Sequence, residues 1–351
     1  MKKTLFIILI LVSLGLLVGC LKSVSYKNFN TDIAHHGEDA FISQAIISSP
    51  LLSYFRMRLR EGSMPDITDK MLADIQMPID QAALLNPQPQ PQITWVGHAT
   101  VLVQYQGINF LTDPHFSQRA APVSFAGPKR LVPPAINLQA LPEIDFVLIS
   151  HNHYDHLDSA TVEALGNQTH WYVPLGLAAW LEKRGIASDN ITELDWWQQH
   201  QLRHHVTITM TPNVHWSKRT PFDTNKTLWG GWAVQVEDFS LWFAGDTGYD
   251  QEMFKHIGDQ LGPFDVALIP IGAYGPRYFM LPQHVDPAQA VQIHKDIKAR
   301  HSIGIHWGTF QLSHEPFWEP AELLQQEVES QNLSVADFFT IKIGETWQMN
   351  P

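Results

Sequence analysis

The chain has 351 residues, 44% of them hydrophobic, with 35 acidic and 23 basic side chains, 18 histidines and one cysteine. These values suit one large folded domain or two smaller ones and exclude a disordered chain or a fibre. The formal net charge of −12 counts against nucleic-acid binding, because nucleic-acid-binding proteins neutralise phosphates with clustered Lys and Arg. A single cysteine excludes a disulfide scaffold and argues against a cysteine-built metal site, so nitrogen and oxygen must hold any bound metal.

The first twenty residues have the pattern of a targeting signal. Two lysines precede an apolar stretch over residues 5–18, which is short for a membrane span, and a glycine and Cys20 follow it. Leu17-Val18-Gly19-Cys20 resembles the bacterial lipobox, in which the signal is cleaved before a cysteine that becomes lipidated. We therefore expect a lipoprotein signal peptide over residues 1–19 and a lipid anchor on Cys20. The alternative is an uncleaved signal anchor or an ordinary secretory signal.

Residues 20–92 are predicted to form the lipidated start of the mature chain, a tether and a helical or extended segment. Residues 21–30 are polar and unpatterned, as in a tether. Apolar residues at helical spacing over residues 52–59 predict an amphipathic helix, which docks on its own domain or, less commonly, dips into lipid. The proline-rich run over residues 86–91 predicts an extended joint. The main domain is therefore expected over residues 93–351.

Short β-rich runs follow one another in this domain, and helical patterns separate several of them. The predicted strands cover residues 93–96, 101–105, 108–112, 146–150, 171–173, 206–211, 232–236, 241–244, 266–270 and 302–306. The clearest predicted helix has Asp286 as its N-cap and Pro287 at its first position. Strands in two batches with interspersed helices indicate a layered α/β architecture with two sheets packed face to face.

Four side chains of metal-ligand type leave one loop at the end of a continuous apolar strand. The strand over residues 146–150 runs directly into His151, His153, Asp155 and His156. A lone histidine is usually structural, but packing gives no reason to concentrate imidazoles and a carboxylate at one sheet end, whereas a divalent cation compensates for their proximity. His151 and His153 lie two apart on extended backbone and can bind one ion, while Asp155 and His156 reach a second.

Three further residues of ligand type each follow an apolar strand, namely His215, Asp246 and His306. Asp246 is the natural bridge, because a carboxylate has two oxygens to share between two cations. Neither ion is fully enclosed, and the shared open position suits a bridging water. The predicted ligands are His151, His153, His215 and Asp246 for one ion and Asp155, His156, His306 and Asp246 for the other.

The chain contains the motif His-x-His-x-Asp-His, followed at a distance by a His, an Asp and a His. This order of residues resembles that of the metallo-β-lactamase superfamily. Flanking motifs make the chain similar to the N-acyl-phosphatidylethanolamine-hydrolysing phospholipase D family, over roughly residues 93–312. These motifs are WVGHAT at residues 95–100, GPKR at 127–130, ELDWW at 193–197, HWSKRT at 215–220, FAGDTGY at 243–249, QHVDP at 283–287 and IHWGTF at 305–310.

This resemblance implies an αββα sandwich, two zinc ions on the ligands above, and cleavage of a phosphodiester to phosphatidic acid and an N-acylethanolamine. It also implies that Tyr154 and His284 contact the phospholipid substrate and that the chain can form a homodimer. Two departures leave substrate choice open. Animal members carry an acidic residue where Gly275 stands, and the region before Ile93 shows no usable match.

For His98, Asp113 and two basic pairs, the sequence allows both a role at the metal site and an ordinary structural or surface role. His98 and Asp113 are candidates to orient metal-bound imidazoles, and each equally suits an Asx turn or a buried polar pair. The basic pairs Lys129-Arg130 and Lys218-Arg219 can receive a phosphate headgroup, but ordinary solvated surface is the expected role.

The combined prediction is a zinc-dependent phosphodiester hydrolase of the phospholipase D type, anchored by lipid in the bacterial cell envelope. Leu21 after Cys20 favours the outer membrane, facing the periplasm, by resemblance to lipoprotein sorting. The alternatives are another hydrolase on the same site, such as a lactonase or a nucleotide phosphodiesterase, and a non-catalytic metal-binding envelope lipoprotein. Structural zinc sites are normally closed four-ligand cages, so seven ligands with open coordination favour an enzyme.

Overall fold

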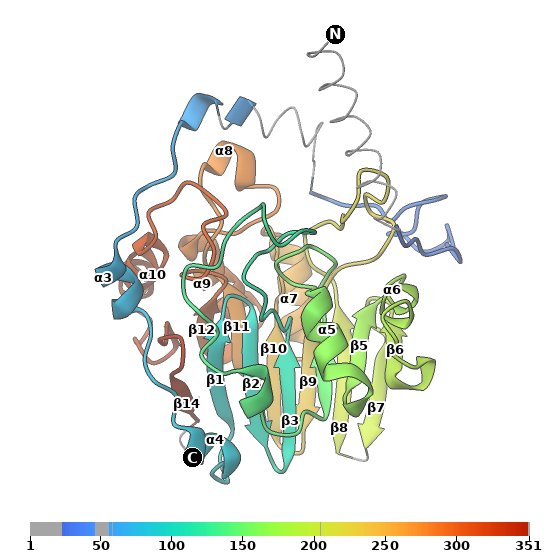
Figure 1. The fold of residues 1–351 in the computed structure, drawn as a ribbon, viewed down its shortest axis with the longest axis horizontal. Coiled ribbons are helices and arrows are strands. Elements are labelled where there is room, and N and C mark those ends of the chain that lie inside the picture. The colour runs from blue at the N-terminus through green and yellow to red at the C-terminus, as the bar shows by residue number, and fades with distance from the viewer. Residues whose placement is uncertain (1–22, 46–55, 58, 204, 350–351) are drawn as a thin grey trace.

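Two seven-stranded sheets pack face to face and carry helices on their outer sides (Figure 1). The computed structural model describes residues 23–45, 56–57, 59–203 and 205–349. Cys20 and the predicted signal peptide lie outside the described residues. The αββα sandwich expected from the sequence is confirmed.

The first sheet has the strand order β14-β1-β2-β3-β4-β5-β6. The neighbours from β1 to β3 are antiparallel, and those from β3 to β6 are parallel. The strands are β1 (Gln92–Gly97), β2 (Thr100–Tyr105), β3 (Ile108–Thr112), β4 (Phe146–Leu148), β5 (His170–Pro174), β6 (Ile191–Leu194) and β14 (Thr346–Gln348).

The second sheet has the order β13-β12-β11-β10-β9-β8-β7. Its strands are antiparallel from β7 to β10 and parallel from β10 to β13. They are β7 (Gln199–Arg203), β8 (Val206–Thr211), β9 (Gly231–Val236), β10 (Phe239–Phe243), β11 (Phe264–Pro270), β12 (Ala299–Ile305) and β13 (Phe338–Phe339).

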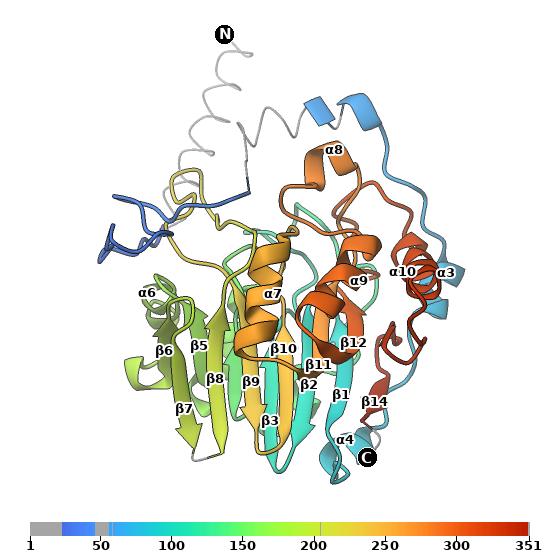
Figure 2. The same ribbon diagram turned by 180° about the vertical axis from the view of Figure 1, so that it is seen from behind.

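Helices cover the outer face of each sheet. Figure 1 shows α5 in front of the first sheet and α6 beside β5 and β6, and Figure 2 shows α7 and α9 on the far side, over the second sheet. The predicted Asp286 cap and Pro287 start of α9 are confirmed. The helices are α3 (Asp69–Asp74), α4 (Gln81–Leu85), α5 (Ser159–Leu165), α6 (Ala178–Glu182), α7 (Gln251–Gln260), α8 (Arg277–Met280), α9 (Pro287–Asp296) and α10 (Glu319–Ser330).

Strand β4 shows why its sequence is continuously apolar. Phe146 and Leu148 pack into the core between the two sheets, whereas Val147 and Ile149 pack under the helices of the outer layer. Successive side chains of a strand point to opposite faces, so a strand covered on both sides needs an apolar residue at every position. The loop that follows β4 therefore starts from a strand that is packed on both faces.

Strands β6 and β7 were not among the strands predicted from the sequence. They lie at the edges of the two sheets, where few of their side chains are buried. An edge strand with alternating exposure carries little of the apolar pattern on which strand prediction depends.

The segment before the sandwich differs from the expected tether. Val24 is only 4% exposed, and the rings of Tyr26, Phe29 and Phe41 pack on one another. The backbone N–H of Tyr26 donates to the carbonyl of Lys226 at 2.7 Å. The described part of residues 21–30 is therefore bound to the domain, because its apolar side chains find a partner there.

The expected amphipathic helix over residues 52–59 lies partly outside the described residues. Residues 56, 57 and 59–61 are helical, but Leu59 is 85% exposed, so this side chain does not dock on the domain as expected. In the described part of the chain, no helix is long and apolar enough to cross a membrane.

Trp232 joins the two sheets through one hydrogen bond. Its indole Nε1 on β9 donates to the carbonyl of Ile149, directly after β4, at 2.9 Å, and the whole side chain is buried. A buried carbonyl without a donor is costly, so this bond helps to hold the sheets in register at the end that carries the polar loops.

Trp232→Phe should lower the free energy of unfolding by about 2 kcal/mol or more, because it removes this donor and leaves a small cavity. Denaturant unfolding followed by circular dichroism measures the change. Trp197→Phe is the matched control, since Trp197 is exposed and its loss should change stability by about 0.5 kcal/mol or less. Equal effects of the two substitutions would contradict the proposed link.

Candidate functional site

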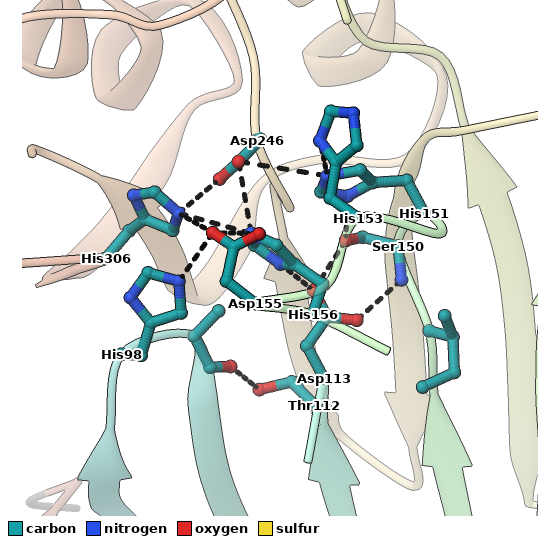
Figure 3. A network of polar contacts seen from close by, with 12 residues as sticks. His98, Thr112, Asp113, Ser150, His151, His153, Asp155, His156, Asp246 and His306 are labelled. Atoms are coloured by element: carbon teal, nitrogen blue, oxygen red, sulfur yellow. Dashed lines mark hydrogen bonds and ion pairs between the residues drawn. The ribbon is translucent and has the colours of Figure 1, made fainter. Parts of the chain in front are cut away.

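The side chains predicted to bind metal converge at one end of the sandwich, where strands of both sheets end, and Figure 3 labels all of them except His215. The loop after β4 in the first sheet carries four of them, and the segments after β8, β10 and β12 in the second sheet carry three. Their role as ligands stays a prediction, but the structure brings all seven together. They are His151, His153, Asp155, His156, His215, Asp246 and His306.

The first group consists of His151, His153, His215 and Asp246, whose ligand atoms all lie within 4.8 Å of one another. The Nδ1 of His153 is 2.8 Å from the Nε2 of His151 and 3.3 Å from the Nε2 of His215. These are the four residues that the sequence assigned to one ion.

The second group consists of His98, Asp155, His156 and His306, again within 4.8 Å. His156 and His306 turn their Nε2 atoms toward each other at 3.2 Å, and Asp155 Oδ2 lies 3.4 Å from the former and 3.6 Å from the latter. His98 Nε2 donates to Asp155 Oδ2 at 3.1 Å, and the centre of its ring lies 4.0 Å from that of His306. His98, expected to act behind the ligands, is therefore as close to this centre as the predicted ligands are.

Asp246 reaches both groups. Its Oδ1 is 3.0 Å from His306 Nε2, and its Oδ2 is 3.1 Å from His156 Nε2, 3.8 Å from His215 Nε2 and 3.9 Å from His151 Nε2. Burial raises the pKa of this carboxyl, but the attraction of His156 and His306 outweighs burial and holds the pKa well below its ordinary range. The buried carboxylate therefore stays charged between the two groups of imidazoles.

Hydrogen bonds outside the site set which nitrogen of each ring faces inward. Asp113 is fully buried and accepts from Ser150 N at 2.7 Å and from His156 Nδ1 at 2.6 Å. His215 Nδ1 lies 3.1 Å from the carbonyl of Gln283 and can only donate to it. In both histidines Nδ1 thus carries a proton, and Nε2 points into the site, where it can bind a cation when it is unprotonated. Asp113 therefore fixes the orientation of the His156 ring, and the role of this ring as a metal ligand stays a prediction.

Unusual backbone conformations turn these side chains inward. His98, Asp113 and His306 all have positive φ, at 57°, 32° and 63°. Non-glycine residues rarely adopt this region, and such residues gather at functional sites. Gly245, with φ 62°, precedes Asp246, and a Cβ there would lie 2.5 Å from that of Ser150. Only glycine lets the end of β10 approach the end of β4 this closely.

Tyr154, predicted to contact substrate, lies on the other side of the ligand loop. Its hydroxyl donates to the carbonyl of Arg219 at 2.8 Å, and the Arg219 guanidinium lies 4.0 Å from its ring centre. Tyr154, Trp180 and Arg219 line a cavity of about 830 Å³, to which none of the seven predicted ligands contributes. The structure therefore places Tyr154 beside this cavity rather than among the ligands.

His284, the other predicted substrate contact, does face the site. Its ligand atom lies within 4.8 Å of those of Asp246 and His306, and its ring centre is 5.4 Å from that of His215. Burial lowers the pKa of His284 to about 4, so the ring is neutral at pH 7. Its buried Nδ1 contacts no polar partner among the described residues.

The expectation that both basic pairs are solvated surface is wrong for two of the four residues. Lys129 is exposed, but Arg130 is only 4% exposed and donates to the carbonyls of His115 and Ser117. Arg219 donates into the ligand loop. The only sequence signal for the bonding of these two arginines to backbone carbonyls is the position of Arg219, four residues after His215. A pattern of charged residues does not show which carbonyls lack donors.

Gly275, the position at which the resemblance noted from the sequence implies an acidic residue, lies against Glu315. A Cβ at this position would lie 2.9 Å from Glu315 Oε2 and 2.7 Å from its backbone nitrogen. The Glu315 carboxylate accepts from the N–H groups of Ala273 and Gly275, at 2.7 and 2.8 Å. A carboxylate is thus present beside this loop, supplied by a different residue.

A third cluster joins the N-terminal segment to the domain. Asp195 accepts from the Nε2 atoms of His35 and His36, at 2.6 and 3.1 Å. The N–H of Asn30 donates to His36 Nδ1, so the His36 proton is on Nε2 and its lone pair does not face the cluster. This cluster therefore fastens the segment, which continues to Ser43, whose hydroxyl donates to the carbonyl of His215.

Comparison with known proteins agrees with this geometry. Residues 108–307 match the model of the beta-lactamase superfamily domain family. The chain is 42% identical over 312 residues to N-acyl-phosphatidylethanolamine-hydrolyzing phospholipase D 1 of Caenorhabditis elegans, a match that covers 85% of this chain and 88% of the relative. The matched 85% of this chain is longer than the stretch from Ile93 to Pro351, so the similarity continues before Ile93. The sequence by itself had shown no usable match there.

Two further proteins extend the comparison. The mitochondrial N-acyl-phosphatidylethanolamine-hydrolyzing phospholipase D of Saccharomyces cerevisiae is 37% identical, over 67% of this chain and 51% of the relative, so the chain spans about half of that protein. Isothiocyanate hydrolase from Delia radicum gut bacteria has the same fold, with a TM-score of 0.59 and 19% identity over 74% of this chain and 100% of that one.

The match to the superfamily model covers more than half of the chain, and the worm relative is matched over most of its length. The chain therefore belongs to the metallo-β-lactamase superfamily, in the family of N-acyl-phosphatidylethanolamine-hydrolysing phospholipase D, and is a metal-dependent hydrolase.

Proposed function

We propose that this hydrolase uses two zinc ions to cleave N-acyl-phosphatidylethanolamine into phosphatidic acid and an N-acylethanolamine. The observation that carries the proposal is the pair of ligand groups joined by Asp246, in which only His153 and Asp155 are partly exposed. The names of the worm and yeast relatives support the choice of substrate. A non-catalytic metal-binding lipoprotein does not agree with the membership of the chain in a hydrolase family.

The donor set fits zinc. Nitrogen and oxygen atoms of histidine and aspartate are ordinary zinc ligands, and the protons on His156 Nδ1 and His215 Nδ1 leave an Nε2 lone pair in each group. Facing nitrogens, such as His156 Nε2 and His306 Nε2 at 3.2 Å, cannot all be satisfied by one another, whereas a cation accepts every lone pair. His151, His153, His215 and Asp246 would hold one ion, and Asp155, His156, His306 and Asp246 the other.

In the proposed reaction, a water oxygen forms a bond to phosphorus and the bond from phosphorus to the ethanolamine oxygen breaks, with a proton transferred to that oxygen. Bound zinc supplies a lower pKa for water, about 7 instead of 15.7, and offsets charge on the phosphoryl oxygens. The residues of this chain fix the geometry. Asp113 and the carbonyl of Gln283 orient His156 and His215, and the buried Asp246 keeps the groups at a constant separation.

We also propose that the protein is a lipid-anchored envelope protein and can form a homodimer. The lipobox before Cys20 supports the anchor, and a phospholipid substrate suits an enzyme held at a membrane. The residue after Cys20 supports the outer membrane, with the domain in the periplasm.

The substrate proposal is tested by incubating the purified mature protein with N-acylated and plain phosphatidylethanolamine and identifying products by mass. We expect N-acylethanolamine and phosphatidic acid from the N-acylated lipid, with about two zinc ions per chain by elemental analysis. Asp246→Ala should lose most of the zinc and reduce turnover by about a thousandfold or more, whereas exposed Asp189→Ala should change neither.

Three results would contradict the proposal. Release of a fatty acid would place the cleaved bond elsewhere in the lipid. Faster hydrolysis of a lactone or a nucleotide phosphodiester would favour another hydrolase on the same site. Full zinc content and turnover in Asp246→Ala would reject the bridging role of this carboxylate.

Asp113→Asn should weaken zinc binding about 10- to 100-fold, because the amide can offer its NH2 group to His156 Nδ1 and no longer holds the proton there. Competition with a chelator measures the affinity. Asp265→Asn is the matched control, since Asp265 is also buried and accepts from a serine N–H and hydroxyl, Ser240, but lies outside the site. Equal losses of zinc affinity in both variants would show a general effect of burying an amide.

Cys20→Ala should abolish incorporation of a labelled fatty acid and leave the signal peptide uncleaved, because the lipidated thiol is missing. Labelling in growing cells and the mass of the purified chain measure both effects. A wild-type chain that carries no fatty acid, or a variant that is labelled like the wild type, would reject the anchor.

A further inference from the structure

Arg219 is bonded to the loop that carries four of the predicted ligands. Its Nη1 donates to the carbonyl of Asn152 at 2.9 Å and to that of Leu157 at 2.7 Å, and lies 3.4 Å from the carbonyl of His153. Asn152 and His153 lie near the start of the stretch from His151 to His156, and Leu157 directly follows it. One guanidinium nitrogen thus bridges the start and the end of the ligand loop through hydrogen bonds.

The other contacts of Arg219 add to this restraint. Its guanidinium lies 4.0 Å from the ring centre of Tyr154 and 4.8 Å from that of Trp180, and Tyr154 donates back to the Arg219 carbonyl. The preceding N–H, of Lys218, donates to Asn152 Oδ1 at 2.7 Å. The ligand loop is therefore held on the segment that follows His215, which is itself a predicted ligand.

Arg219 has no substitute among the described residues. No other described donor reaches the carbonyls of Asn152 and Leu157, and buried carbonyls without donors are costly. Burial lowers the pKa of Arg219 to about 10, so the side chain still carries its charge at pH 7. The guanidinium can both bond to carbonyls and stack flat on an aromatic ring, which an ammonium group cannot do.

We propose that Arg219 is a positioning residue for the metal centre, which sets His151 and His153 at the distance from His215 that one metal ion requires. It acts through the backbone of the loop and contacts neither metal nor substrate. This inference rests on the metal site proposed above and deepens it, because it adds to the ligands a residue that holds their two loops together.

The test compares the wild-type protein with Arg219→Met and Arg219→Lys. Arg184→Met is the matched control, because Arg184 stacks on the same Trp180 ring at 3.3 Å and lines the same cavity, but donates to Ser159 and to the Trp180 carbonyl instead of the loop. The measurements are zinc stoichiometry, zinc affinity by chelator competition, thermal unfolding of the metal-free proteins, and separate kcat and KM values.

We expect Arg219→Met to weaken the affinity for one of two zinc ions about 10- to 100-fold, the range seen when a group that supports a metal ligand is removed. Arg219→Lys should recover part of this loss, because lysine keeps the donor and the charge without the stacking. Arg184→Met should bind zinc within about twofold of the wild type. A fall in kcat with little change in KM should accompany the loss of zinc affinity.

Other results would overturn the inference. Unchanged zinc affinity in both Arg219 variants, with two zinc ions on the wild type, rejects the positioning role and leaves the metal site intact. A raised KM with normal zinc binding would instead make Arg219 a substrate contact. Equal zinc loss in Arg184→Met would assign the effect to packing around Trp180. A wild-type chain that binds no zinc rejects the metal site and this inference together.

Discussion

The buried Asp246 carboxylate between two sets of imidazoles is the interaction on which the rest of this structure depends. It touches His156 and His306 at 3.1 and 3.0 Å and lies within 4 Å of His151 and His215. A buried charge needs close partners of opposite sign, so this carboxylate is stable only where both ligand groups are assembled. Asp246 belongs to the second sheet and His151 and His156 to the first, and the site therefore requires the sandwich to be closed.

The sandwich is closed by apolar packing and kept in alignment at the polar end by a few specific contacts. The bond from Trp232 to the carbonyl of Ile149 crosses from one sheet to the other, and Gly245 lets the end of β10 approach Ser150. Residues with positive φ then turn the side chains of His98, Asp113 and His306 toward the centre. Strain of this kind persists only where surrounding structure holds it, here two sheets with apolar cores.

The loops around the centre are fastened by residues that no metal would contact. Asp113 orients His156, Arg219 joins the ligand loop to the segment after His215, and Ser43 of the N-terminal segment donates to the carbonyl of His215. The cluster of His35, His36 and Asp195 attaches that segment to the domain.

The seven ligand-type residues and the fold could be predicted from the sequence, because strands buried on both faces have a continuous apolar pattern and polar residues directly after them stand out. Edge strands such as β7, the buried state of Arg130, the bonds of Arg219 to the ligand loop, and the proximity of His98 to the second group could not. Each of these features depends on which carbonyl, ring or carboxylate from a distant part of the chain contacts the residue. The sequence around an arginine or a histidine does not show whether the residue lies in a surface loop or in a buried one. The sequence alone determined the chemistry available at the strand ends. Only the tertiary structure decided that His98 lies in the second group and that Arg219 bonds to the ligand loop, because these contacts join segments that are far apart in the chain.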